Sequence, residues 1–235
     1  MKNYLYFFIF IIISLCTASA QHENDNWFFK NYNGITFKYG NPISVNGGQI
    51  RMAPCAVMSD KKTGDLLFYT DGKNIWNRNH QIMQNGANLM AVGYSPEYAL
   101  ILPDLKNELQ FIVFTLQKNA SQNQEFCFSI ISMQDPDGEV ISKDNVHLIT
   151  TGKIGSVVAT RDCEGNGFWI VTHSIINHLF YSYHITTSGI NILPSISTPI
   201  LSTYIPTSII PLTNPEPSYM KISPNGRYLA IGSRL

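Results

Sequence analysis

Four segments of this 235-residue chain follow one pattern, and the repeat constrains the fold more than any other feature of the sequence. In each, a short apolar run ends in Asp or Asn, a polar turn follows, and a run rich in aromatic and aliphatic residues comes next. The segments are 55–60 leading to 65–70, 99–104 leading to 109–115, 157–162 leading to 167–172, and 220–225 leading to 227–231. They start about 45 to 65 residues apart, which is the spacing of propeller blades. The repeat predicts a β-propeller of four-stranded antiparallel blades, with about four units present.

The remainder of the chain also favours β-structure, because no long stretch shows a helical period. Short runs rich in aromatic and β-branched residues are bounded by clusters of Asn, Gly, Asp and Pro, as is typical of strands and turns. The predicted strands are 36–39, 66–70, 111–115, 126–132, 168–172, 180–185 and 228–231. With 44% hydrophobic and 14% charged residues, the chain can bury a full core. The predicted fold class is all-β.

Turn-forming residues indicate where the predicted strands are connected. Asp71-Gly72 stands between two strand-like runs and predicts a two-residue type I′ hairpin turn, in which both central residues have positive φ. Further tight turns are predicted at Asn85-Gly86, Asp137-Gly138 and Asn225-Gly226. The four hairpins carry a turn-forming side chain at matching positions, namely Asp60, Asp104, Asp162 and Asn225. We expect each of these side chains to cap the backbone of its own turn.

The first twenty residues predict a secretory signal peptide. Residues 5–15 are an almost unbroken apolar run, and Ala18-Ser19-Ala20 is a cleavage site of the A-x-A kind. The run is about half of the roughly 20 residues that a membrane-spanning helix needs. Cys16 raises a lipoprotein signal as the alternative, but Leu15 stands where such a signal carries a small residue. We expect cleavage after Ala20, leaving 21–235 as the propeller region of an exported, secreted or cell-surface protein.

The cysteines and the charge balance exclude several classes of site. After cleavage, Cys55, Cys127 and Cys163 remain, so at most one disulfide can form among them. Their spacing, with nearby histidines such as His173 and His178, completes no zinc pattern, and we expect no metal and no cofactor. The 16 basic residues balance the 16 acidic ones. Charge therefore gives no reason to expect a nucleic acid or an anionic membrane as partner.

Two stretches resemble known families. Met220-Lys-Ile-Ser-Pro-Asn-Gly-Arg-Tyr-Leu-Ala-Ile231 resembles the blade hairpin of TolB-like and WD-repeat-like β-propellers. Residues 66–86, with Asn26-Trp-Phe-Phe29 before them, resemble the N-terminal propeller region of large secreted Bacteroidetes proteins of the gliding-motility-associated class, which leave by type IX secretion. The stretches 168–173 and 180–183 are similar to the same pattern.

The resemblance covers nearly all of 24–232 and implies further propeller blades and a sorting domain in a full-length parent. The sequence stops at Leu235, directly after a predicted strand, with neither of these. We therefore expect a truncated propeller with exposed sheet edges. A complete four-bladed ring is the alternative.

Candidate binding residues follow from propeller topology, in which ligand sites gather at the mouth of the central channel. The residues just before the innermost strands are Arg51, Glu97, Tyr98, Lys153 and Tyr219. The basic pair suits an anion or a carboxylate partner, and the tyrosines suit stacking on a sugar or a peptide. A second group consists of the family-motif residues Asp71, Gly72, Trp76, Asn77, Arg78 and His80. Turn formation and core packing are the stronger interpretation of this second group.

Enzyme signatures are sparse. The sequence has no Gly-x-Ser-x-Gly, His-Glu-x-x-His, phosphate-loop or calcium-loop motif. A propeller glycosidase needs paired carboxylates, and only Glu97 stands near a predicted channel entrance. The sequence favours a non-catalytic binding or scaffold propeller of an exported protein, with a protein or glycan ligand and a role in adhesion among the possibilities. A degenerate or truncated carbohydrate-active propeller is the alternative.

Overall fold

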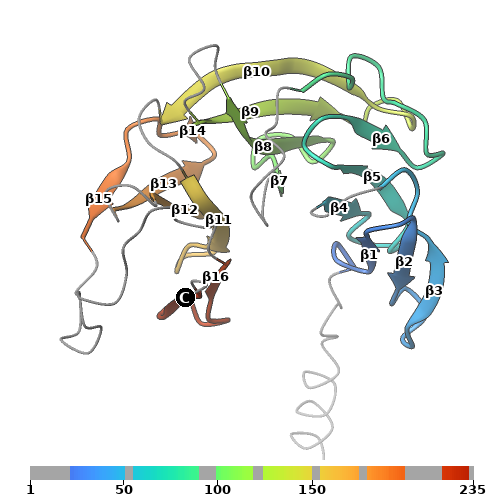
Figure 1. Ribbon diagram of the computed structural model, residues 1–235, viewed down its shortest axis with the longest axis horizontal. Helices are drawn as coiled ribbons and strands as arrows, with labels where there is room; N and C mark the ends of the chain where they lie inside the picture. The colour runs from blue at the N-terminus through green and yellow to red at the C-terminus, as the bar shows by residue number, and fades with distance from the viewer. Residues whose placement is uncertain are drawn as a thin grey trace, which may run out of the picture.

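The computed structural model describes residues 22–50, 55–89, 99–118, 124–149, 154–174, 179–198 and 219–232. Every helix or strand assigned in these ranges is a β-strand (Figure 1), which confirms the predicted all-β class. In the same ranges no helix is long and apolar enough to cross a membrane. The signal peptide predicted for residues 1–20 lies outside the described residues.

In the described ranges, seventeen strands form five antiparallel sheets that follow one another along the chain. The first sheet holds β1 (Asn26–Phe29), β2 (Asn33–Thr36) and β3 (Ile43–Asn46), and the second holds β4 (Ala56–Ser59), β5 (Leu66–Thr70) and β6 (Ile75–Asn77). The third holds β7 (Ala99–Pro103), β8 (Gln110–Lys118), β9 (Gln124–Ser132) and β10 (Glu139–Ile149). The fourth holds β11 (Ile154–Arg161), β12 (Phe168–Ser174), β13 (Phe180–Thr186), β14 (Gly189–Ile190) and β15 (Ser195–Ser197). The last hairpin is β16 (Tyr219–Ile222) with β17 (Leu229–Gly232).

All four hairpins of the sequence repeat are present. β4 pairs with β5, β7 with β8, β11 with β12, and β16 with β17, each in antiparallel fashion. The side-chain caps are also confirmed, because Oδ1 of Asp60 accepts the backbone N–H groups of Lys62 and Thr63 at 2.8 Å. Matching bonds run to Asp104, Asp162 and Asn225 from Lys106, Asn166 and Arg227. A cap of this kind satisfies turn N–H groups that the strand ladder leaves free.

Two details of the sequence repeat differ from the structure. The first sheet lies outside the repeat, and in the described residues only the third sheet has the four strands expected of each unit. The strand predicted at 36–39 is wrong, since the chain leaves β2 at Thr36 and turns. Gly40 closes that turn at φ 84°, and its N–H donates to the carbonyl of Phe37 at 2.8 Å. The Phe37 ring packs on Trp27 instead, with 5.2 Å between ring centroids.

The turn at Asp71-Gly72 also needs correction. Thr70 pairs with Ile75, so the connection is a four-residue loop, 71–74, rather than a two-residue turn. Gly72 has the predicted positive φ of 84°, but Asp71 does not have one, so the type I′ prediction is wrong. Oδ1 of Asp71 accepts the N–H groups of Lys73 and Asn74 at 2.8 and 2.9 Å. This side-chain cap stabilises a wider loop than the backbone-only turn we expected.

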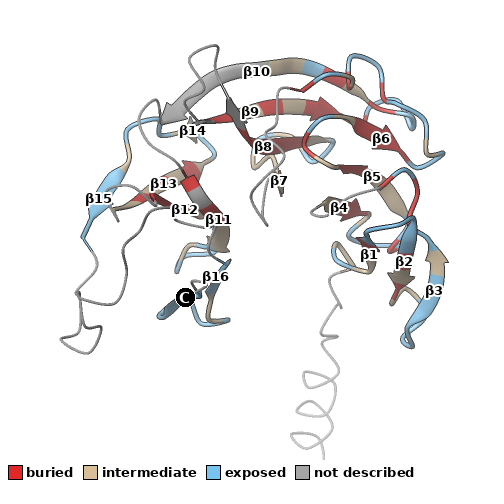
Figure 2. Ribbon diagram, viewed as in Figure 1, coloured by how far each residue is buried: buried red, intermediate tan, exposed pale blue. Residues whose placement is uncertain are grey.

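Buried residues lie on strands such as β5, β6, β8 and β9 (Figure 2), and apolar clusters lie between neighbouring sheets. Phe28 of the first sheet contacts Tyr69 of the second, with ring centroids 5.0 Å apart. Phe68 of the second sheet meets Phe111 of the third at 5.4 Å. The largest cluster lies between the third and fourth sheets and includes Phe114, Phe126, Ile170 and Tyr183, each 0% exposed.

The first strands of successive sheets lie next to one another, in the order β1, β4, β7, β11 and β16. The five sheets fan outward from this inner row and form an open arc, with the first sheet at one end and the last hairpin at the other (Figure 1). Because the first strands of successive sheets are neighbours, each sheet can pack face to face against the next. The apolar clusters lie between these packed faces.

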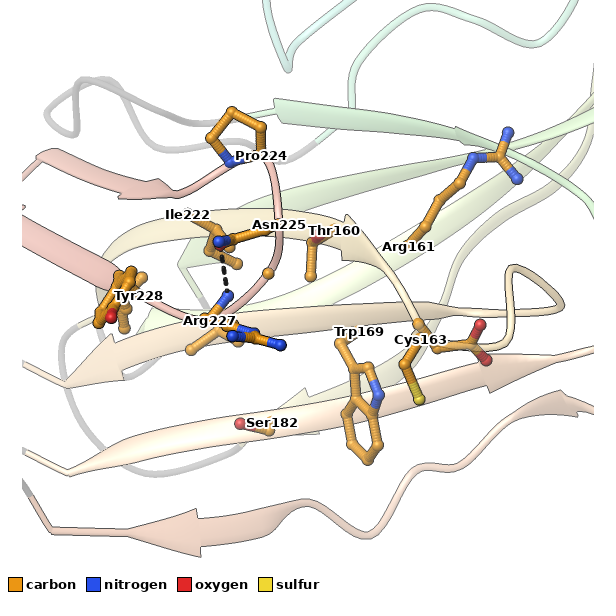
Figure 3. Close-up of a pocket in the computed structure, with 14 residues that line it drawn as sticks. Thr160, Arg161, Cys163, Trp169, Ser182, Ile222, Pro224, Asn225, Arg227 and Tyr228 are labelled. Carbon is orange, nitrogen blue, oxygen red and sulfur yellow. Dashed lines mark hydrogen bonds between the residues drawn. The ribbon is translucent and has the colours of Figure 1, made fainter.

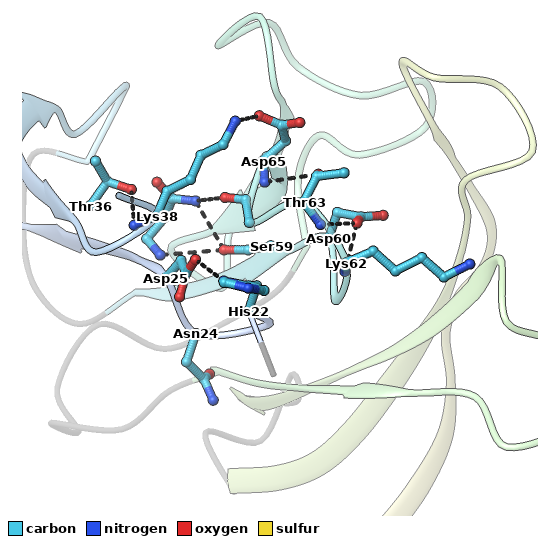
Figure 4. Close-up of polar contacts among 12 residues, drawn as sticks. His22, Asn24, Asp25, Thr36, Lys38, Ser59, Asp60, Lys62, Thr63 and Asp65 are labelled. Atoms are coloured by element: carbon cyan, nitrogen blue, oxygen red, sulfur yellow. Dashed lines mark hydrogen bonds and ion pairs between the residues drawn. The ribbon is translucent and has the colours of Figure 1, made fainter. Parts of the chain in front are cut away.

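Polar contacts join the first two sheets at the edge of their shared core (Figure 4). Nδ2 of Asn26 donates to Oγ of Ser59 at 3.0 Å and to the carbonyl of Gly64 at 2.8 Å. The ammonium group of Lys38 forms an ion pair with the carboxylate of Asp65. These bonds fix the first sheet against the β4–β5 hairpin.

Candidate binding groove

Of the five residues predicted for a channel mouth, the structure describes Tyr219 alone. Four of them, Arg51, Glu97, Tyr98 and Lys153, lie outside the described residues. The fifth, Tyr219, opens β16, and 62% of it is exposed. Its neighbour Met220 is fully buried, so the Tyr219 side chain lies on the opposite face of the hairpin from the core.

The family-motif residues surround a buried tyrosine on β5. The Trp76 ring stacks on Tyr69, with 5.3 Å between centroids and 17° between planes. The Tyr69 hydroxyl lies 3.1 Å from Nδ1 of His80. Asn77 is 4% exposed, and its Oδ1 accepts the N–H groups of Asn79 and Gln81. Arg78 is exposed. Apart from Arg78, these contacts serve the turn and the core between the first two sheets.

A groove of about 720 Å³ lies between the fourth sheet and the last hairpin (Figure 3). Its volume falls within the range of small-ligand pockets, about 300–1,000 Å³. The fourth sheet contributes Thr160, Arg161, Asp162, Cys163, Trp169, Val171 and Ser182. The hairpin contributes Ile222, Pro224, Asn225, Gly226, Arg227, Tyr228 and Leu229. We name this site the hairpin groove.

Strand register explains why these side chains meet. Trp169 lies opposite Thr160 on one neighbouring strand and opposite His184 on the other, so the three form a row on one face of the sheet. Phe168 and Ile170 point to the other face and are buried against the third sheet. The two-residue period of the strand thus divides β12 into a core face and a face toward the groove.

The row is held by specific contacts. The indole of Trp169 stacks on the imidazole of His184, with 4.3 Å between centroids and 7° between planes. Nε2 of His184 lies 3.2 Å from Oδ2 of Asp162. Partial burial raises the pKa of the Asp162 carboxyl, but the hydrogen bonds from His184 and from the turn backbone outweigh it and hold that pKa below its usual range. Asp162 therefore stays ionised and orients His184 at neutral pH.

The rim of the groove carries an arginine and a thiol. Arg227 is exposed at this rim, whereas Arg161 lies opposite Phe168, and its guanidinium is 5.1 Å from the Phe168 ring centroid, on the face of the sheet away from the groove (Figure 3). Cys163 is exposed and forms no disulfide with Cys55 or Cys127. Among the described residues, no group of His, Cys, Asp and Glu has the geometry of a metal site. The groove combines hydrogen-bond donors with aromatic and aliphatic surface, which suits a neutral or anionic ligand.

Sequence reasoning missed this groove. Trp169 stood out only as part of a stretch that resembled a family, and Arg227 only as part of a turn. Residues 168–171 are all apolar, so the sequence does not distinguish the face of β12 that carries Trp169 and Val171 from the buried face of Phe168 and Ile170. No local sequence pattern indicates that the last hairpin lies close to the fourth sheet.

Comparison with protein-family models, curated proteins and solved structures finds no match to this chain. Evidence for function therefore comes from the arrangement of the sheets and from the lining of the hairpin groove.

Proposed function

We propose that this chain is part of a β-propeller of an exported protein and acts as a non-catalytic binding module. The row of neighbouring first strands, β1, β4, β7, β11 and β16, carries this proposal. In a propeller the innermost strand of each blade surrounds the axis, and the blades pack face to face. The inner row and the apolar clusters between successive sheets both fit this architecture.

The lining of the hairpin groove supports binding rather than hydrolysis. A glycosidase places two carboxyl groups about 5 to 9.5 Å apart around the scissile bond. Among the residues that line the groove, Asp162 carries the one carboxylate, and His184 and the turn backbone hold it. Arg227 and Trp169 instead provide hydrogen-bond donors and an aromatic surface for a protein or glycan ligand.

Export and a cell-surface or secreted location complete the proposal. The A-x-A site at Ala18-Ser19-Ala20 supports export, and the resemblance of residues 66–86 supports a parent of the gliding-motility-associated class with further blades and a type IX sorting domain. Mass spectrometry of protein from the native host should find Gln21 at the mature N-terminus. An intact Met1 on protein from the cytoplasm would contradict export.

A binding screen tests the function itself. The mature chain is applied to glycan and peptide arrays, and hits are compared with two single variants. Arg227→Ala, at the rim of the groove, should weaken binding, whereas Lys221→Ala, which is exposed on the opposite face of the same hairpin, should not. Hydrolysis of a bound glycan would favour the carbohydrate-active alternative. Absence of binding to both arrays would contradict the proposed function.

A further inference from the structure

A short segment of the first sheet crosses a buried phenol of the second. We name this segment, residues 47–50, the strap, and it directly follows β3. The strap is bonded to its own sheet, because the N–H of Tyr32 donates to the carbonyl of Ile50 at 3.0 Å. It also reaches the second sheet, where the N–H of Gln49 donates to the Tyr69 hydroxyl at 3.0 Å. One hydroxyl group of β5 thus holds a backbone amide of the strap.

The strap lies directly against two titratable side chains. Gly48 has φ 64°, and a Cβ at this position would lie 2.2 Å from the phenol oxygen of Tyr69 and 2.6 Å from Nδ1 of His80. Ile50, at the end of the strap, is 0% exposed. A change in the contact between Tyr69 and His80 therefore acts on the strap without any intervening group.

The partners of the Tyr69 hydroxyl determine where its proton lies. Its oxygen accepts the N–H of Gln49, so its own O–H needs an acceptor. In the described part of the chain, the other hydrogen-bond partner of this hydroxyl is Nδ1 of His80, at 3.1 Å. A neutral imidazole has one nitrogen without a proton. The contact therefore holds His80 neutral, with its proton on Nε2.

Protonation of His80 removes this acceptor. Both nitrogens of an imidazolium are donors, so Nδ1–H and the Tyr69 O–H would compete for the same oxygen lone pairs and one proton would lose its partner. Tyr69 is 0% exposed, so water does not replace the lost partner. A buried donor without an acceptor is costly. His80 itself is half-buried, and its ring remains within reach of solvent protons.

The charged and titratable groups around this pair come from other elements. They are Cys55 and Asp71, whose charges act on the phenol, Arg78 in the turn of His80, and Asp137, which accepts a hydrogen bond from that turn. β1 and the strap bring no titratable side chain. Within the described ranges, none of the four groups forms a hydrogen bond or ion pair with His80. The phenol is therefore the direct partner that responds to the imidazole.

We propose that His80 makes this junction acid-sensitive: protonation of its imidazole frees the strap from the Tyr69 hydroxyl and loosens the first sheet from the second. The closed strap favours the neutral imidazole, whereas an open strap leaves the imidazole free to take its proton, as an ordinary histidine does near pH 6.5. The strap should stay closed above this pH and open more often as the pH falls below it. This acid sensitivity does not depend on the ligand of the hairpin groove.

A second imidazole near the junction has the opposite effect. Nδ1 of His22 lies 2.7 Å from Oδ2 of Asp25, and the N–H of His22 donates to the carbonyl of Lys61 at 3.4 Å. Protonation would pair the His22 imidazole with a carboxylate charge and tighten this contact. Loosening in acid therefore points to His80, and tightening points to His22.

Hydrogen exchange of the mature chain at pH 7.5 and pH 5.5 tests the inference. Each rate is divided by the intrinsic rate of that amide at the same pH, because exchange itself depends on pH. We expect protection in 43–50 to fall about five- to tenfold at the lower pH, which is the range that linkage to one imidazole allows. Protection in β8, on the third sheet, should not change.

Two variants separate titration from packing. His80→Asn provides a neutral amide oxygen that can accept from the phenol, and asparagine tolerates the φ of 61° at this position. Tyr69→Phe removes the hydroxyl proton that the imidazole accepts. Each variant should leave less than about a twofold difference between the two pH values, even where Tyr69→Phe lowers protection at both. His22→Gln is the control and should keep the dependence of wild type.

Three results would overturn the inference. They are equal or greater protection of 43–50 at pH 5.5 in wild type, an equal loss in β8, or a loss in acid that His80→Asn retains. If His80→Asn does not fold, a loss in acid that Tyr69→Phe retains would reject the inference instead. Failure of the chain to bind either array would contradict the proposed function and leave the acid sensitivity of the strap intact.

Discussion

The hydroxyl oxygen of Tyr69 lies 3.1 Å from Nδ1 of His80 and accepts the backbone N–H of Gln49 at 3.0 Å. Tyr69 belongs to β5 and Gln49 follows β3, so one buried phenol joins the first two sheets. Burial raises the pKa of Tyr69 to about 12, so its hydroxyl stays protonated at neutral pH. A Cβ on Gly48 would lie 2.2 Å from the phenol oxygen, so the chain needs glycine there.

Replacing Tyr69 by phenylalanine should destabilise the fold. The variant keeps the ring but leaves the Gln49 N–H and the His80 imidazole without their partner. A buried polar group that loses its hydrogen bond costs about 1–3 kcal/mol. We expect Tyr69→Phe to lower the free energy of unfolding in urea by this amount. Tyr228→Phe, at a residue that is 72% exposed, should have almost no effect, and equal losses in the two variants would contradict the role of the hydroxyl.

Replacing Gly72 by valine should also destabilise the fold. Gly72 has φ 84°, a region in which a β-branched side chain clashes with its own backbone. We expect a loss of about 1–2 kcal/mol in the free energy of unfolding. Gly232→Val is the control, because nothing lies within 4 Å of a Cβ at that position. A Gly72→Val variant as stable as the wild type would show that the loop adopts another conformation in solution.

Local signals in the sequence were sufficient to predict the hairpins. Each hairpin depends on a short apolar run, a turn, and a capping side chain such as Asp60 or Asp104, all within about 15 residues. The first sheet was missed because β1–β3 are short. In addition, Trp27 and Phe29 on β1 are half exposed, so their apolar character does not indicate which face of the strand is buried.

The hairpin groove could not be predicted in the same way. It forms where Trp169 on β12 approaches Arg227 in the turn of the last hairpin, and these residues are far apart in the sequence. Packing of whole sheets brings them together, and no turn or strand pattern encodes that contact. The row of Trp169 and His184 depends on strand register, which a single sequence specifies only through the faces it buries.

The cysteines should differ sharply in reactivity. Burial, with a smaller contribution from the charge of Asp71, raises the pKa of the Cys55 thiol to about 11. Cys163 is exposed and Cys127 is buried. Because the thiolate is the nucleophile, we expect a maleimide at pH 8 to label Cys163 first and the other two slowly. Mass spectrometry after proteolysis locates the label, and unfolding in guanidinium should make all three react. Rapid labelling of Cys55 in the folded chain would contradict its buried placement.

The contact between Asp162 and His184 predicts a dependence of stability on pH. Partial burial opposes ionisation of Asp162, but hydrogen bonds from His184 and from the backbone of the turn keep its pKa below the usual range. A carboxyl whose pKa is lower in the folded state stabilises the fold above its unfolded value, about 3.9, and loses that contribution as the pH falls through the folded value. Wild type should therefore exceed Asp162→Asn in stability at neutral pH, and the difference should shrink toward zero below about pH 4.

Urea unfolding across this pH range measures the difference between the two proteins directly. Glu164→Gln, an exposed change in the same turn, corrects for the general effect of removing one negative charge. His184→Gln supplies a second check, because it removes the imidazole that bonds to Asp162. When His184→Gln is present in both proteins, the pH-dependent difference that Asp162→Asn produces should become smaller. A difference that grows as the pH falls, or one that is unchanged by His184→Gln, would mean that this contact does not set the ionisation of Asp162.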